Sequence, residues 1–217
     1  GSAPSGFQRT ALVARNGYIE TSQGRVHLTN INLEEDACRE IHEGAGEDEV
    51  MFRLDRVGIP LIEVGTAPDI TSPEQALEAA KKIGMLLRSL PGVKRGLGTI
   101  RQDVNVSIPN GARIEIKGAQ ELKLLPLLVE LEVKRQQELL KLRAELKGVT
   151  LNTLTITDLS LLLNNSSSAI LKKTQQQGGK ILGMKLAGFA GLLGRELQPK
   201  YRLGTEFAGR AKVIAGV

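Results

Sequence analysis

The stretch "TIRQDVNVSIPNGARIEIKG", Thr99–Gly118, consists of two runs in which polar and apolar residues alternate, joined by Pro109-Asn110-Gly111. Alternation with a period of two is typical of strands, and an Asn-Gly pair between two such runs is a strong signal for a β-hairpin. One face of this predicted hairpin is polar and charged, and carries Arg101, Asp103, Asn105, Ser107, Arg113, Glu115 and Lys117. The stretch therefore predicts an antiparallel sheet with a charged face.

The segments on either side extend this prediction to an α+β fold. Residues 7–33 contain three more alternating runs, "ALVA", "YIET" and "RVHLTNINL", separated by the turns "RNG" and "SQG". Residues 34–43 have the apolar spacing of a short helix, whereas residues 48–58 and 59–70 are typical of extended chain. Residues 71–90 predict a helix with Ser72 as N-cap and Gln75 as its capping-box partner, and residues 122–147 predict a longer one.

The composition changes near residues 148–152, so we predict two domains, residues 1–149 and residues 150–217. The second region begins with neutral, polar sequence. Its last part, "GKILGMKLAGFAGLLGRELQPKYRLGTEFAGRAKVIAGV", predicts a strand, a glycine-rich loop and a short helix.

The bulk composition is that of an ordinary soluble globular protein, with 41% hydrophobic and 24% charged residues. Aromatic residues make up only 3%, which disfavours a protein that stacks single-stranded bases on aromatic rings. The net charge of +5 fits an anionic partner such as RNA but does not require one. The single cysteine, Cys38, excludes an internal disulfide and a cysteine-based zinc site. Neither a signal peptide nor an apolar run of about 20 residues is visible, so we expect a cytoplasmic protein with no membrane partner.

Carboxylates recur on one predicted strand after another, at Glu34, Glu35, Glu63, Asp103 and Glu115. Several carboxylates beside Arg and Lys suit a Mg²⁺ ion that bridges phosphate oxygens, because Mg²⁺ prefers oxygen ligands and keeps waters and phosphates in its shell. Arg101 and Lys117 could then neutralise charge on a transferred phosphoryl group. No Walker-type phosphate loop is present, so any nucleotide would be bound by the sheet.

Each of these features also has a structural explanation. Glu34–Asp36 suit the first turn of a helix, Glu63 suits a buried ion pair with Arg56 or Arg101, and the hairpin charges suit a solvated sheet face. His27, His42, Cys38 and the glycine-rich "GFAGLLGRE" are each typical of structural positions.

Five segments together resemble the B and E subunits of tRNA-dependent amidotransferases, the GatB/GatE family. They are "INLEEDACR", "RVGIPLIEVGTAPDITSPEQA", "GLGTIRQDVNVSI", "RIEIKGAQEL" and "GFAGLLGRELQPKYRLGTEFA". They occur in the family's order from about Ser5 to Val217, and "IKGAQEL" and "GTIRQDVNVS" resemble the archaeal E type of the family.

The resemblance implies an enzyme part. Subunits of this kind use ATP and Mg²⁺ to phosphorylate the γ-carboxylate of glutamate misacylated onto tRNA(Gln). Ammonia from an asparaginase-like amidase partner, GatD, then displaces the phosphate and yields Gln-tRNA(Gln). The implied fold is an antiparallel-sheet cradle related to glutamine synthetase for residues 1–149. Residues 150–217 resemble part of an α+β insertion domain shared with bacterial-type aspartyl-tRNA synthetases.

The resemblance also implies site residues. Glu35 in "NLEEDA" and Glu63 in "PLIEVG" match magnesium-binding acids, and Asp103 and Glu115 match further acidic positions. We add Arg101, Asn105 and Lys117 as contacts for phosphate or the glutamyl group, from their place on the hairpin.

The sequence departs from the family's pattern at both ends. No "GLEIH" strand precedes Phe7 and no tRNA-binding helical tail follows, so we expect this polypeptide alone not to be a competent amidotransferase. Two other functions are open, a non-catalytic tRNA-binding or assembly module and a glutamine-synthetase-like ligase that acts on a small molecule.

Overall fold

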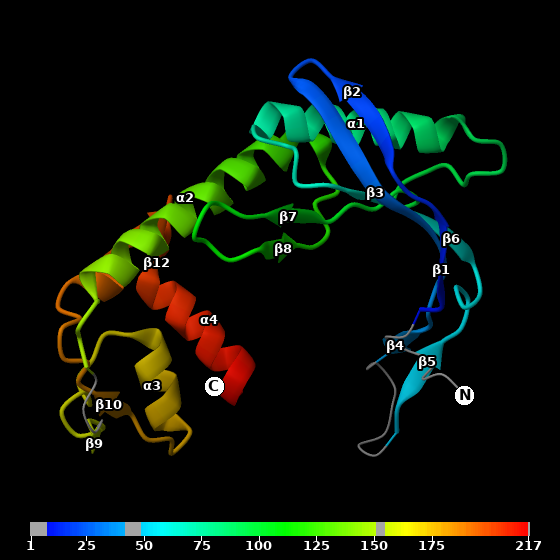
Figure 1. Ribbon diagram of the computed structural model, residues 1–217. Coiled ribbons are helices and arrows are strands. Elements are labelled where there is room, and N and C mark those ends of the chain that lie inside the picture. The colour runs from blue at the N-terminus through cyan, green and yellow to red at the C-terminus, as the bar shows by residue number, and fades with distance from the viewer. Residues whose placement is uncertain (1–7, 42–48, 151–154, 217) are drawn as a thin grey trace. The chain divides into compact units, whose positions relative to one another are not determined.

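The computed structural model describes residues 8–41, 49–150 and 155–216 and shows a mixed α+β chain with small antiparallel sheets (Figure 1). The chain divides into two compact units. The first comprises residues up to 104 and 115–130, and the second comprises residues 105–114 and 131–217. The predicted boundary near residue 149 lies within the second unit. The relation of residues 150–217 to a synthetase insertion domain stays a prediction, as does that of the sheet to glutamine synthetase.

The first unit is built around one long strand, β3 (Gly24–Glu35). β2 (Gly17–Thr21) and β1 (Thr10–Ala14) pair antiparallel with successive stretches of β3, and β6 (Pro60–Thr66) also pairs antiparallel with it. These are the three strands predicted from residues 7–33 and the strand predicted from residues 59–70. A bulge between Leu28 and Asn30 shifts the β3–β6 register by one residue. Because side chains alternate along a strand, such a shift decides which residues share a face.

Helix α1 (Pro73–Ser89) covers one face of this sheet (Figure 1). Its Ser72 hydroxyl accepts a hydrogen bond from the Gln75 backbone N–H at 3.1 Å, which confirms the predicted N-cap. The Gln75 side chain accepts from the backbone N–H of Thr71, one residue before the position that a capping box expects. The core beneath the helix is aliphatic and contains Ile19, Val26, Leu28 and Ala79, with Val64, Ile70 and Ile83 packed against it.

The short helix predicted for residues 34–43 is wrong over its described part. After β3 ends at Glu35 the chain forms β4 (Arg39–Ile41), which pairs antiparallel with β5 (Met51–Arg53). Three apolar residues, Ala37, Cys38 and Ile41, fit either a helix or a strand period in so short a segment. The pairing with β5, ten or more residues away, selects the strand. His42 and Glu43 lie outside the described residues.

The predicted hairpin is present but short. β7 (Val104–Val106) and β8 (Ile114–Ile116) pair as a two-stranded sheet. Its turn differs from the Asn-Gly type that the sequence indicated. The Gly111 backbone N–H donates to the Ile108 carbonyl at 2.9 Å and Asn110 has φ of 65°. Pro109 and Asn110 are therefore the central residues, as in a type II turn, and Asn110 takes the left-handed position.

The long helix is also confirmed, with a 3₁₀ turn η1 (Leu122–Leu124) leading into α2 (Leu125–Glu145). In the second unit, Leu142 of α2 packs with Leu197 and Leu203 in an aliphatic core. The remaining elements of this unit are β9 (Ile156–Asp158), α3 (Ala169–Gln176), β10 (Leu182–Met184), η2 (Leu192–Gly194), β11 (Glu196–Gln198), β12 (Tyr201–Arg202) and α4 (Leu203–Ala215). The predicted strand and final helix correspond to β10 and α4, whereas α3 and the β11–β12 hairpin were not predicted.

Candidate functional site

The acids at the end of β3 are divided between the two faces of the sheet. Glu35 lies opposite Pro60 and Glu63 lies opposite Asn32 in the β3–β6 register. Residues opposite one another in an antiparallel pair share a face, and neighbours along a strand alternate. Glu35 therefore shares the face of Val64, on which α1 packs, whereas Glu63 and Glu34 share the other face.

Glu35 forms an ion pair with Arg9, the residue that precedes β1. The Arg9 Nε atom donates to Glu35 Oε2 at 2.5 Å, and the Glu35 side chain is 31% exposed. This hydrogen bond from Arg9 lowers the pKa of the Glu35 carboxyl and holds it ionised. Glu35 is thus a half-buried carboxylate paired with an exposed arginine, which is compatible with a metal ligand and equally with a structural ion pair.

Glu63 is exposed and lies beside Glu34. Its Oε2 atom accepts a hydrogen bond from Asn32 Nδ2 at 3.1 Å. The alternative explanation of Glu63, a buried ion pair with Arg56 or Arg101, is wrong because Glu63 is exposed, and Arg56 Nε instead donates to Asp36 Oδ2 at 2.7 Å. Burial and the charge of Glu63 together raise the pKa of the Glu34 carboxyl. A cation bound between Glu34 and Glu63 would relieve this repulsion.

Asp36 has a structural role. It is 9% exposed, its side chain pairs with Arg56, and its backbone exchanges hydrogen bonds with the loop before β6. The Asp36 N–H donates to the Ile59 carbonyl at 2.9 Å, and the Gly58 N–H donates to the Asp36 carbonyl at 3.1 Å. Of the three adjacent acids, Asp36 therefore fixes the loop, while Glu34 and Glu35 emerge on opposite faces.

A second group of predicted residues does come together in the first unit. Lys117 Nζ lies 3.3 Å from Asp103 Oδ2 and 3.1 Å from Glu115 Oε1, so one ammonium bridges both carboxylates. The Gly118 N–H donates to Asp103 Oδ1 at 3.0 Å, and this bond, with Lys117 and Arg101, lowers the pKa of Asp103. Glu115 and Asp103 in turn raise the pKa of Lys117. The like charges of Asp103 and Glu115 are thus offset by a protein cation.

The remaining predicted residues are exposed. Arg101 lies in the segment before β7, and Asn105 lies on β7 in the second unit. Within residues 8–41, 49–150 and 155–216, no hydrogen bond or ion pair joins the group of Lys117 to Glu34, Glu35 or Glu63. The same described residues contain no group of three or more His, Cys, Asp or Glu that could hold a metal ion. Any Mg²⁺ here would take one or two carboxylates and complete its shell with waters and phosphate oxygens.

Sequence reasoning missed a buried polar network in the second unit. Arg135 donates to both oxygens of Glu132, at 2.8 and 3.0 Å, and to Glu206 Oε2 at 3.0 Å. Tyr201 and Arg210 also donate to Glu206, and Gln136 donates to Glu132 and to the Val106 carbonyl. Among the described residues, every buried side-chain polar atom has a partner. The network is therefore a satisfied structural link from α2 to α4 and to the hairpin turn. The ion pair of Glu132 with Arg135 could have been predicted from their spacing of three residues on a helix. The contact of Arg135 with Glu206, which is 71 positions away, could not.

The glycine-rich "GFAGLLGRE" contains two glycines with positive φ and an arginine that pairs with α2. Gly188 and Gly191 have φ of 81° and 76°, and Arg195 makes a bidentate ion pair with Glu145 of α2 at 2.7 and 2.8 Å. His27 has a structural partner too, since Asp69 Oδ2 lies 2.7 Å from its Nδ1. No helix in the part of the chain that the structure describes is long and apolar enough to cross a membrane.

Comparison with known proteins places these features in a family. A family model described as the GatB/GatE catalytic domain matches residues 1–182. The E-type subunit of glutamyl-tRNA(Gln) amidotransferase from Methanocaldococcus jannaschii is 53% identical over 219 residues, which cover 100% of this chain and 34% of that protein. The subunits of the same name from Pyrococcus abyssi and Haloarcula marismortui are each 54% identical, over 98% of this chain and 34% of theirs. The chain therefore spans about a third of the length of these relatives.

Proposed function

The chain belongs to the GatB/GatE catalytic-domain family, and we propose that it is the ATP-dependent carboxyl-activating part of a glutamyl-tRNA(Gln) amidotransferase. The observation that carries the proposal is the family match over residues 1–182, which includes every predicted acid. The identity of 53–54% to amidotransferase subunits along essentially the whole chain supports it. The chain spans only a third of those subunits, so the activity of the whole enzyme belongs to the proposal.

The proposed chemistry follows from the poor reactivity of a carboxylate. Ammonia cannot displace an oxide from the γ-carboxylate of a glutamyl group. Transfer of the γ-phosphoryl group of ATP to that carboxylate releases ADP and gives an acyl phosphate. Ammonia then attacks the acyl carbon and inorganic phosphate leaves, so that the glutamyl group becomes glutaminyl. We propose that the ammonia comes from an asparaginase-like amidase partner, GatD, and that the acceptor is glutamate carried on tRNA(Gln).

This chemistry brings two anions together, and the described residues fit that task. Mg²⁺, when bound with the nucleotide, would neutralise phosphate charge and favour oxygen ligands of the kind these strands supply. Glu35 and Glu63 remain the proposed ligands, with one constraint from the geometry. While the β3–β6 register holds, one ion cannot take both as direct ligands, because they lie on opposite faces. Whichever acid is required would identify the face on which the nucleotide binds.

The group around Lys117 is proposed to meet the phosphoryl or glutamyl group. Lys117 and Arg101 would neutralise phosphate oxygens, and Asp103, Glu115 and Asn105 would orient the reacting groups. In the free chain the Lys117 ammonium is held between Asp103 and Glu115. A phosphate entering this group would share the ammonium with both carboxylates, which keeps the cation positioned before the ligand binds.

Magnesium-dependent nucleotide binding tests the proposal. Calorimetric titration of the 217-residue chain with ATP should show binding that requires Mg²⁺ and that Glu35→Gln or Glu63→Gln weakens while the far-UV circular dichroism stays unchanged. Glu74→Gln, which removes an exposed acid from α1, is the matched control.

Two results would point to the other functions. Absence of ATP binding, or binding unchanged in both Glu35→Gln and Glu63→Gln, would favour a non-catalytic RNA-binding or assembly module. Hydrolysis of ATP with a free amino acid and no tRNA would favour a ligase that acts on a small molecule.

A further inference from the structure

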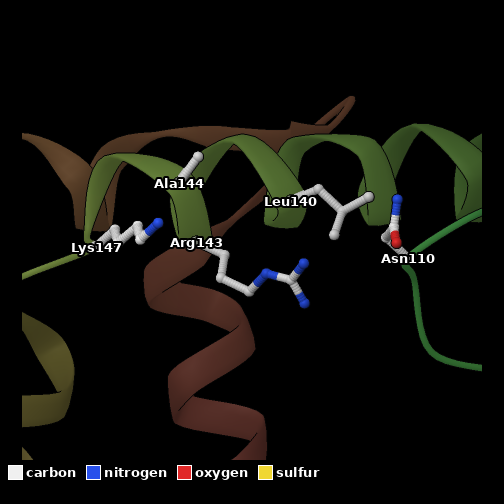
Figure 2. Close-up of a pocket in the computed structure, with 5 residues that line it drawn as sticks. All are labelled: Asn110, Leu140, Arg143, Ala144 and Lys147. Atoms are coloured by element: carbon white, nitrogen blue, oxygen red, sulfur yellow. The ribbon is translucent and has the colours of Figure 1, made fainter.

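A pocket on the side of α2 contains two cations that no carboxylate among the described residues neutralises. It lies within the second unit, has a volume of about 630 Å³, and is lined by Asn110, Leu140, Arg143, Ala144 and Lys147. Figure 2 shows the side chains of Leu140, Arg143 and Lys147 projecting from one stretch of helix, with the Asn110 amide beside Leu140. The lining has two positive charges and no acidic residue.

The neighbouring acids do not reach these cations because other partners hold them. Glu132 pairs with Arg135, Glu138 pairs with Lys141, and Glu145 pairs with Arg195. Within the described residues, Arg143 and Lys147 make no ion pair and no side-chain hydrogen bond, and both are exposed. The sequence already indicates that these two cations lack a partner on their own helix, because no Asp or Glu stands three or four positions from Arg143 or Lys147.

The helical spacing gathers the pocket residues on one side. At 3.6 residues per turn, positions 140, 143, 144 and 147 span an arc of about 100°. Lys147 lies in the turn that follows α2, where its backbone N–H donates to the Ala144 carbonyl at 3.2 Å. Arg143 and Lys147 are thus about one turn apart, with apolar Leu140 and Ala144 between and beside them.

The remaining lining residue adds hydrogen-bonding capacity. Asn110 is fixed by the turn of the β7–β8 hairpin, where its φ is 65°. In the part of the chain that the structure describes, its side-chain amide makes no hydrogen bond. The pocket therefore combines two cations for phosphate oxygens, a short apolar floor for a sugar or base, and a free amide that can both donate and accept.

We propose that this α2 pocket is a docking site for the phosphodiester backbone of the tRNA, separate from the residues assigned to carboxyl activation. The proposal rests on the proposed function, because that function supplies an RNA as the polyanion. A planar guanidinium next to a lysine suits adjacent phosphate oxygens, and backbone contacts of this kind position a nucleic acid without reading its sequence.

Salt-dependent RNA binding tests the proposal. The 217-residue chain is titrated with a tRNA(Gln) transcript at several salt concentrations, and its double variant Arg143→Gln/Lys147→Gln is compared with it. Each lost phosphate contact reduces the slope of log K against log salt by about 0.7 to 0.9, so the double variant should lose about 1.4 to 1.8. Its affinity at about 0.1 M salt should fall by about tenfold or more.

Two further variants separate a phosphate site from a change in net charge. Lys134→Gln removes a charge from an exposed position of α2 that is nine residues, or about 180° around the helix, from Arg143. It should reduce the RNA affinity and the salt slope less than Arg143→Gln does. Arg143→Lys/Lys147→Arg keeps both charges and should retain the salt slope. Circular dichroism verifies that each variant is folded.

Three results would overturn the proposal. The first is an unchanged slope and affinity in the double variant. The second is an equal effect of Lys134→Gln and Arg143→Gln. The third is a loss of ATP or inorganic phosphate binding in the double variant without a loss of RNA binding, which would assign the pocket to a small phosphate ligand. Each leaves the proposed function standing as long as ATP binding by the wild-type chain requires Mg²⁺.

Discussion

Glu35 and Glu63 lie on opposite faces of the β3–β6 pair, because Glu35 is opposite Pro60 whereas Glu63 is opposite Asn32. Glu34 and Glu63 share a face, and the charge of Glu63 contributes to raising the pKa of Glu34. The register of β3 against β6 thus decides which acid lies on the same face as Glu63. Glu35 and Glu63, the two predicted magnesium ligands, are on opposite faces of the sheet, and Glu34 is the acid on the same face as Glu63.

Double-mutant cycles on magnesium-dependent ATP affinity measure this relationship. We expect Glu35→Gln and Glu63→Gln to act independently, with a coupling energy below about 0.5 kcal/mol. Glu34→Gln and Glu63→Gln should couple more strongly, because each removes half of one like-charge pair. Calorimetric titration of the single and double variants gives both values. A strong coupling of Glu35 to Glu63 would mean that the register or the assignment of faces is wrong.

Glu78 of α1 stabilises the turn between β2 and β3 at neutral pH. Its carboxylate accepts from the Ser22 hydroxyl at 2.6 Å and from the Ser22 N–H, and Lys82 lies 3.0 Å away. These contacts, the Ser22 hydroxyl first, lower the pKa of Glu78 to about 2. A lowered pKa stabilises the fold above the pKa of the unfolded chain, and this stability is lost as the pH falls toward 2.

Glu78→Gln should therefore be less stable than the wild type at pH 7, and the difference should shrink steadily below pH about 4.5. Urea unfolding between pH 2 and 7 measures the difference. Glu74→Gln, on the same helix, should not reproduce this pH dependence. A difference that is constant across the range would mean that the ionised form of Glu78 is not the stabilising species.

The sequence predicts best where the signal is local. Ser72 and Gln75 lie three residues apart, and the N-cap follows from that spacing alone. The hairpin also follows from local alternation, although Pro109 and Asn110 rather than Asn110 and Gly111 form the centre of its turn. The helix predicted over residues 34–41 is wrong because the period of a short apolar pattern is ambiguous and the partner strand is distant in sequence.

The candidate site depends on information that no local pattern contains. Whether Glu63 shares a face with Glu34 or Glu35 depends on a one-residue bulge between Leu28 and Asn30. The contact of Lys117 with Asp103 and Glu115 is the exception, because all three residues lie within the stretch that predicts the hairpin. The buried position of Arg135 was not visible, because its second partner, Glu206, comes from the far end of the chain.

Arg135 should be among the most sensitive positions of the second unit. It is 9% exposed, and its removal leaves the buried carboxylates of Glu132 and Glu206 without their shared cation. Breaking such a group by deleting one partner typically costs about 3–5 kcal/mol. We expect Arg135→Met to lower the free energy of unfolding by that amount in urea titrations, while the exposed neighbour Lys134→Met stays within about 0.5 kcal/mol of the wild type. A cost for Arg135→Met below about 1 kcal/mol would mean that water enters the network.

Substitution of Gly111 measures how closely the hairpin turn packs against Gln136, which belongs to the buried network around Arg135. A Cβ at Gly111 would collide with Gln136 Oε1 and lie 2.8 Å from Ile108 Cγ1, although the backbone of Gly111 does not have a positive φ. The cost of Gly111→Ala is therefore steric, and overpacking of this kind typically costs about 1–3 kcal/mol. Gly209→Ala in α4 is the matched change in open space, and it should raise the free energy of unfolding by up to about 1 kcal/mol because alanine favours the helix.

The origin of the Gly111 effect can be isolated through Gln136. Gln136 is 3% exposed, and its amide accepts from the Ile108 N–H at 3.3 Å and donates to the Val106 carbonyl at 3.1 Å. If the added methyl group acts by displacing this side chain, Gly111→Ala should cost much less in a Gln136→Ala background than in the wild type. Additive costs, measured by urea unfolding of the four proteins in the cycle, would mean instead that Ile108 and the turn backbone carry the strain.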